Sequence, residues 1–168
     1  MPPKVVMDLN IQNDNGDTLF MIGCYKGRME IVQELITHTD QYNINRQNVY
    51  GFTALHWACA GNQLEVVQQL CTIPHLNMNL LSDDGDTPFM VACDRNYKAI
   101  ALELLKYHTR FNINQQSRDF KTKGYTMLHS ACLSNQYDIL QKLCTIESCD
   151  INKQNDDGDT AFMIACNK

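Results

Sequence analysis

The sequence predicts an all-α solenoid of stacked helix-turn-helix repeats, which are joined by short hairpin fingers. One observation is a fixed period: glycines that close similar turns are spaced 35, 34, 39 and 34 residues apart. These glycines are Gly16, Gly51, Gly85, Gly124 and Gly158. A period of this length is typical of repeat arrays, in which each unit buries its apolar face against its neighbours. The second observation is a helical spacing of apolar residues in each repeat, without the period-two alternation of a strand.

Each repeat begins with a turn that leads into a helix. The copy at residues 155–160 reads Asn-Asp-Asp-Gly-Asp-Thr, and residues 13–18 match it closely. Glycine tolerates a positive φ, while Asn and Asp side chains bond to the local backbone. The threonine is a suitable N-cap, and Pro88 falls at the first helical position of its repeat. In the first repeat we expect helices over about 18–25 and 29–38.

The second helix of each repeat carries an apolar stripe. In the first repeat the stripe consists of Ile31, Val32, Leu35 and Ile36. The equivalent residues are Val66, Val67, Leu70 and Cys71, then Ile100, Ala101, Leu104 and Leu105, then Ile139, Leu140, Leu143 and Cys144. This spacing places each set on one face of a helix. Because one pair of helices is too small to bury such a face by itself, we expect adjacent repeats to cover it.

Two segments carry the signature of a known family. Residues 53–59 read Thr-Ala-Leu-His-Trp-Ala-Cys, and residues 87–92 read Thr-Pro-Phe-Met-Val-Ala. Both resemble the T-P-L-H-x-A signature of the ankyrin-repeat family. Residues 64–71 and 150–152 look like the family's second helix and its D-V-N exit. The resemblance implies an ankyrin-repeat solenoid that recognises other proteins.

We expect a single ankyrin-repeat domain over residues 1–168. Its predicted parts are the tail of a preceding repeat (1–13), repeat 1 (14–48), repeat 2 (49–82), repeat 3 (83–121), repeat 4 (122–155) and a partial repeat 5 (156–168). Odd repeats carry Phe-Met where even repeats carry Leu-His, which indicates a duplicated pair of repeats. Since the fifth repeat stops without a second helix, we interpret the chain as a fragment of a longer array.

The composition bears on the class of partner. The formal net charge is −5, and 44% of the residues are hydrophobic. Nucleic acids and anionic membranes both favour clustered Lys and Arg, so we expect neither as a partner. No apolar run approaches the length of a membrane span, and the N-terminus lacks the apolar core of a secretory signal.

Eight cysteines raise the question of disulfides or zinc. Five of them recur at one position of the first helix, and two recur at the end of the second helix. They are Cys24, Cys59, Cys93, Cys132 and Cys166, and then Cys71 and Cys144. These spacings contain no C-x-x-C pair, which zinc sites usually need. We therefore expect reduced thiols buried in the core, with Cys149, which lies outside the pattern, as the exposed one. Free thiols in this number indicate a reducing compartment, the cytoplasm.

The sequence predicts no metal, no cofactor and no enzymatic activity. The resemblance implies that the imidazoles of His56 and His129 bond backbone and threonine groups across adjoining loops. The acidic turns lack the acidic residue that an EF-hand places five positions before its glycine, because Ile11, Leu80 and Lys153 stand there. We attribute these turns to local chemistry and helix charge, although they also suit a cationic patch on a partner. Each Cys–His pair repeats with the fold, whereas a catalytic pair should be single.

Trp57 is the residue that most suggests a binding surface. It fills the variable position of the signature, where the other repeats have Ile22, Val91, Ser130 and Ile164. The resemblance implies that this position borders the concave surface. Trp57 is interpreted either as packing between first helices or as an aromatic anchor for a partner, and the sequence leaves both open.

The finger between the third and fourth repeats is four residues longer than the others. It contains Arg118, Phe120, Lys121 and Lys123 in an otherwise acidic row of fingers. Insertions in repeat proteins often map to the binding face. This finger is interpreted either as a tolerated loop or as a contact with an acidic partner.

The predicted function is non-catalytic recognition of a partner protein, of unidentified kind, through the hairpin fingers and the concave groove. The alternative is a targeting or regulatory segment of a larger enzyme, channel or effector. We expect a monomer unless the ends of the array pair. The predicted partner-binding residues are Tyr25, Lys26, Tyr50, Phe52, Trp57, Asp94, Arg95, Arg118, Phe120, Lys121, Lys123 and Tyr125.

Overall fold

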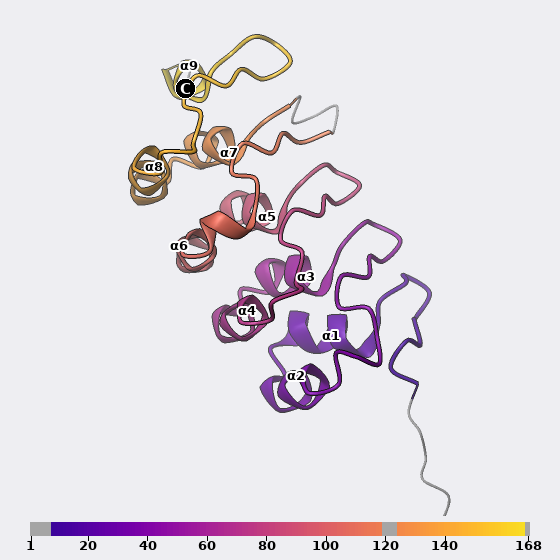
Figure 1. Cartoon of the computed structure of the whole chain (residues 1–168). Helices are drawn as coiled ribbons and strands as arrows, with labels where there is room; N and C mark the ends of the chain where they lie inside the picture. The colour runs from indigo at the N-terminus through magenta and orange to yellow at the C-terminus, as the bar shows by residue number, and fades with distance from the viewer. Residues whose placement is uncertain (1–7, 119–123, 167–168) are drawn as a thin grey trace, which may run out of the picture.

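The structure, a computed structural model, describes residues 8–118 and 124–166. These residues form two rows of short helices with a row of fingers along one side (Figure 1). The inner row, next to the fingers, consists of α1 (Leu19–Lys26), α3 (Ala54–Ala60), α5 (Pro88–Asp94), α7 (Met127–Leu133) and α9 (Ala161–Cys166). The outer row consists of α2 (Met29–Ile36), α4 (Leu64–Cys71), α6 (Lys98–Leu105) and α8 (Tyr137–Cys144), with the 3-10 helix η1 (His108–Arg110) after α6. The predicted all-α solenoid is confirmed.

Threonine caps begin the inner helices, as predicted. Thr18 Oγ1 accepts a hydrogen bond from the Met21 backbone N–H at 3.3 Å, and Thr87 caps α5 in the same way. Pro88 is the first residue of α5, where its missing N–H leaves no bond unmade. Because the threonine is the cap rather than a helical residue, α1 begins at Leu19, one residue later than predicted.

The fingers are loops closed by a tight turn. Among the described residues no strand forms. The two arms of a finger are joined by backbone hydrogen bonds, such as that from the Asn48 N–H to the Phe52 carbonyl oxygen at 3.0 Å, and isolated bridges occur at the first and last fingers. At the second finger Gly51 has a φ of +71°, and a Cβ there would lie 2.7 Å from the Asp83 backbone nitrogen of the next finger. That nitrogen donates a hydrogen bond to the Tyr50 carbonyl oxygen at 3.0 Å. The close approach of adjacent fingers therefore requires glycine at this turn.

The apolar stripe of the outer row is buried most completely in the middle of the array. Val67 and Leu70 on α4 are fully buried between the neighbouring repeats. Toward the two ends, Ile31 on α2 and Cys144 on α8 are exposed, and Leu140 is half-buried. The prediction that adjacent repeats cover the stripe is confirmed where a helix lies on both sides.

Histidine side chains join the even repeats to the fingers that follow them. The Thr53 backbone N–H donates to His56 Nδ1 at 3.1 Å, so the ring proton lies on Nε2. His56 Nε2–H then donates to the carbonyl oxygen of Asp86 at 3.0 Å. His129 makes the same bond to the carbonyl oxygen of Asp159 at 3.2 Å. These contacts confirm the structural role that the ankyrin resemblance implies for both histidines.

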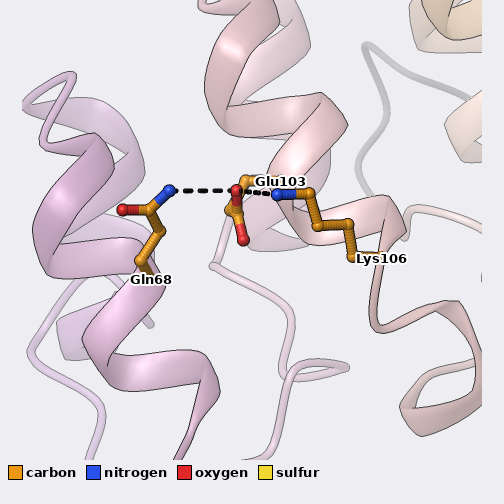
Figure 2. A network of polar contacts seen from close by, with 3 residues as sticks. All are labelled: Gln68, Glu103 and Lys106. Carbon is orange, nitrogen blue, oxygen red and sulfur yellow. Dashed lines mark hydrogen bonds and ion pairs between the residues drawn. The ribbon is translucent and has the colours of Figure 1, made fainter.

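A polar contact also links neighbouring helices of the outer row. Glu103 on α6 is buried, and its carboxylate accepts hydrogen bonds from Gln68 Nε2–H on α4 at 3.1 Å and from Lys106 Nζ at 2.6 Å (Figure 2). Burial by itself would raise the pKa of Glu103, but the bonds from Lys106 and Gln68 hold it below its usual value. The buried charge is thus compensated and ties α4 to α6.

The helices are all short. Each helix from α1 to α9 has six to eight residues. Within residues 8–118 and 124–166, none is long and apolar enough to cross a membrane. In the same part of the chain, no three His, Cys, Asp or Glu side chains are grouped so that they could hold a metal ion.

The cysteines differ in exposure from the prediction. Five of them, Cys24, Cys59, Cys71, Cys93 and Cys132, are buried as free thiols, as expected. The prediction that Cys149 is the exposed thiol is wrong, because Cys149 is half-buried and packs against the core. Cys144 and Cys166 are exposed instead, since no neighbouring helix of the described chain covers their faces.

We expect Cys144 and Cys166 to react with N-ethylmaleimide before Cys149 does. Burial raises the pKa of the Cys149 thiol to about 11, which lowers its fraction of reactive thiolate. Brief labelling of the native chain followed by peptide mass spectrometry measures the order. Labelling in guanidinium chloride is the control, because exposure then no longer distinguishes the sites. Modification of Cys149 as early as Cys144 in the native chain would contradict the assignment.

Candidate partner-binding surface

The candidate surface is the finger side of the inner row. It consists of the finger turns and of the row of inner helices that lies beside them (Figure 1). Along this surface a hollow of about 360 Å³ lies between the first finger, α1 and α3. Its lining residues are Asn13, Asp17, Met21, Ile22, Tyr25, Lys26 and Trp57. The hollow thus brings together three of the predicted site residues, Tyr25, Lys26 and Trp57.

Trp57 is held in place by a hydrogen bond and by two aromatic neighbours. Its indole Nε1–H donates to Asp17 Oδ1 at 2.9 Å. The Tyr25 ring meets the indole edge to face at 5.1 Å between centroids, and the Phe52 ring lies 5.0 Å away on a tilted plane. The indole is half-buried and also lines the hollow. Trp57 therefore does pack between first helices, and its role as an anchor stays a prediction.

Of the other residues that line the hollow, Met21 is buried and several are exposed. Tyr25 is 37% exposed and Ile22 is 40% exposed, both on α1. Lys26 is exposed as well, and its Nζ lies over the Tyr25 ring at 5.2 Å from the centroid. Such a contact is a weak cation–π attraction, which keeps the ammonium at the rim.

Phe52 and Tyr125 occupy equivalent positions in the second and fourth repeats. Each ring is half-buried and lies against the histidine of its own repeat, with 5.2 Å between Phe52 and His56 and 5.4 Å between Tyr125 and His129. These rings shield the imidazoles from water. Contact with a partner through their exposed edges stays a prediction.

The other predicted residues lie apart from the hollow. Tyr50 is 52% exposed at the tip of the second finger, beside the exposed Val49. Asp94 ends α5 and Arg95 follows it, both exposed on the third repeat. Arg118 is exposed on the fourth finger. Phe120, Lys121 and Lys123 lie outside the described residues.

Sequence reasoning missed the carboxylate at the base of the hollow. Asp17 is only 9% exposed, and its Oδ1 accepts a second hydrogen bond, from Asn48 Nδ2 at 2.8 Å. The prediction for the acidic turns treated their carboxylates together and singled out none of them. A signal was present, however: the residue between the turn glycine and the threonine is Asp17, Asp86 or Asp159 in odd repeats, and Phe52 or Tyr125 in even ones. Comparing this position across all five repeats would have singled out residue 17 as a position that differs between odd and even repeats.

Comparison with known proteins places the fold in a family. A family model described as ankyrin repeats in three copies matches residues 4–78 and 62–155, which together make up most of the chain. No curated protein matches the chain. Ankyrin repeats are generally protein–protein interaction modules. The signature segments, the capped inner helices, the histidine joints and this match agree, and the chain belongs to the ankyrin-repeat family.

Proposed function

We propose that this chain is a non-catalytic module that binds another protein through its fingers and the concave face of its inner row. The observation that supports the proposal is the group of exposed apolar side chains around one hollow. Ile22 and Tyr25 are exposed there beside the half-buried Trp57. Aromatic residues beside a preformed hollow are typical of the few residues that dominate binding energy at interfaces.

The finger tips extend this surface. Val49 and Tyr50 are exposed at the second finger, and Arg118 is exposed at the fourth. Exposed apolar side chains at a loop tip stabilise no core and suit contact with a partner. We propose that the second and fourth fingers make secondary contacts with the partner, on either side of the third repeat.

The proposal extends to the state and location of the chain. The acidic net charge of −5 favours a protein partner over nucleic acid or an anionic membrane. Five buried free thiols suit a reducing compartment, so we assign the chain to the cytoplasm. We propose that it acts as a monomer.

Replacing Tyr25 by serine should weaken binding by about tenfold or more, as expected for an interface aromatic residue. The experiment selects peptides from a displayed random library on the immobilised wild-type chain. Affinities of the selected peptides are then measured for Tyr25→Ser and for the matched control Tyr137→Ser. Tyr137 is 72% exposed at the start of α8 in the outer row, away from the fingers.

The two variants separate the proposed surface from the rest of the chain. We expect most selected peptides to lose affinity for Tyr25→Ser and to keep it for Tyr137→Ser. If no selected peptide distinguishes the two variants, the finger side of the inner row is not the binding surface and the proposal fails.

A further inference from the structure

The carboxylate of Asp17 is nearly buried and has no positively charged partner among the described residues. Its Oδ1 is engaged by Trp57 and Asn48, while Oδ2 receives a long hydrogen bond from Asn13 Nδ2 at 3.5 Å. Across residues 8–118 and 124–166, no lysine or arginine forms an ion pair with Asp17. Charged groups that are taken out of water are normally compensated by an opposite charge or by a full set of hydrogen bonds. Asp17 therefore retains capacity to bind a cation at Oδ2.

The walls of the hollow suit the stem of a basic side chain. Ile22 on α1 is 40% exposed and supplies aliphatic surface, and Tyr25 and Trp57 supply aromatic rings. Lysine and arginine bury their methylene stems along apolar surface, and their charged heads are attracted to aromatic rings. The volume of about 360 Å³ is large enough for one such side chain.

We propose that this hollow, the Asp17 hollow, binds a lysine or arginine side chain of a partner segment. The charged head lies at Asp17 Oδ2, and the stem lies against Ile22 and Trp57. This assignment rests on the proposed function and names the chemistry of its partner. The net charge of −5 attracts a basic segment at long range, and the hollow then selects one side chain of it.

Lys26 and the residues that replace Trp57 in other repeats are consistent with one specific binding hollow. Lys26 also lines the hollow, but its Nζ lies over the Tyr25 ring and forms no ion pair with Asp17 in the part of the chain that the structure describes. The position of Trp57 is filled by Val91 in the third repeat and by Ser130 in the fourth. Neither of these residues supplies an aromatic wall or an indole donor. The combination of carboxylate and indole thus belongs to the joint between repeats 1 and 2.

The test uses the only tryptophan of the chain as its reporter. The ¹⁵N-labelled full chain should show a single indole N–H signal in its NMR spectrum, that of Trp57. Butylguanidinium and butylammonium are titrated as probes, with butylurea as the neutral analogue of the same shape. We expect both cations to shift the indole signal saturably, with millimolar affinity for ligands of this size. Butylurea should bind about tenfold more weakly or worse, because it lacks the charge-assisted bond.

Asp17→Asn removes the charge and keeps an oxygen that can accept from Trp57 and Asn48. We expect this variant to bind both cations about tenfold more weakly. Asp86→Asn, at the same position of the third repeat, is the matched control and should bind as the wild type does. Equal binding of butylurea and butylguanidinium, an unmoved indole signal, or unchanged affinity in Asp17→Asn would each overturn the assignment.

Two further readouts keep the inference separate from folding defects and from the proposed function. The first readout needs no variant: on the wild-type chain, 0.5 M salt should weaken binding of the two cations and leave binding of butylurea unchanged. Equal weakening for all three probes, or no weakening for any of them, counts against the assignment.

The second readout uses the selected peptides that lose affinity for Tyr25→Ser. One Lys or Arg in such a peptide should be essential, and replacing it by norleucine should lower the affinity about tenfold. If those peptides contain no basic residue, the Asp17 hollow assignment fails while the proposed function stands. If no peptide distinguishes Tyr25→Ser from Tyr137→Ser, the proposed function itself fails.

Discussion

Replacing Leu70 or Leu143 by alanine should lower the free energy of unfolding by about 2–5 kcal/mol, the usual cost of a large cavity in a well-packed core. Both leucines are fully buried in the outer row, Leu70 on α4 and Leu143 on α8. Neighbouring helices on a solenoid are held by adjacent repeats and collapse little into the space that the missing side chain leaves. The measurement is urea unfolding followed by circular dichroism.

A matched control for Leu143→Ala lies three residues before it on α8. Leu140 belongs to the same apolar stripe as Leu143, but it is only half-buried. Leu140→Ala should therefore cost about 1 kcal/mol, since it removes less buried surface and leaves no closed cavity. An equal loss for Leu140→Ala and Leu143→Ala would mean that the buried face of α8 is misassigned. An unchanged midpoint for Leu70→Ala would contradict the inter-repeat core as described.

Acidification from pH 7 to pH 4 should destabilise the chain by about 3 kcal/mol through His56 alone, at 1.36 kcal/mol per unit of pKa. Burial lowers the pKa of His56 to about 4, although its bond to the Asp86 carbonyl opposes that shift. The unfolded chain, with a histidine pKa near 6.5, takes up a proton below that pH, whereas the folded chain does not until about pH 4. The unfolded state thus binds more protons in this window, so stability falls as the pH falls. Burial also lowers the pKa of His129, which adds to the loss in the same direction.

His56→Met provides the comparison, because odd repeats carry methionine at this position, as at Met21 and Met90. Methionine does not titrate, so the variant should show a shallower fall in stability between pH 6.5 and pH 4 than the wild type. Carboxylates titrate in both proteins and cancel in the difference. Urea unfolding at a series of pH values gives the two profiles. Profiles of equal slope would mean that the folded chain accommodates the protonated imidazole.

The sequence predicted those features that local chemistry determines. The turn glycines, the threonine caps and Pro88 act within a few residues of themselves, so the repeated motif was enough to place them. The histidine joints were predicted through the family resemblance, since His56 reaches a finger 30 residues away. Each of these features follows from a motif that can be read within the sequence of its own repeat.

The features that the sequence did not predict depend on which neighbour a repeat has. Cys144 matches the buried Cys71 in sequence, yet it is exposed because no helix of the described chain covers that side of α8. Cys149 was expected to be exposed and instead is half-buried against the core. Asp17 matches Asp86 in sequence, but only Asp17 receives the indole N–H of a tryptophan from the next repeat. Such differences arise from contacts between repeats and are not visible in a single motif.

The histidine joints have a consequence for how this chain can evolve. His56 and His129 donate to the carbonyl oxygens of Asp86 and Asp159, and every amino acid supplies such an oxygen. Substitution of the side chain at either acceptor therefore leaves the acceptor itself in place. The joint between repeats 1 and 2 is different, because the accepting oxygen belongs to the Asp17 side chain and is lost in any substitution that places no oxygen there. The histidine bonds thus depend on no particular side chain at their acceptors, whereas the joint between repeats 1 and 2 requires a side-chain oxygen at residue 17.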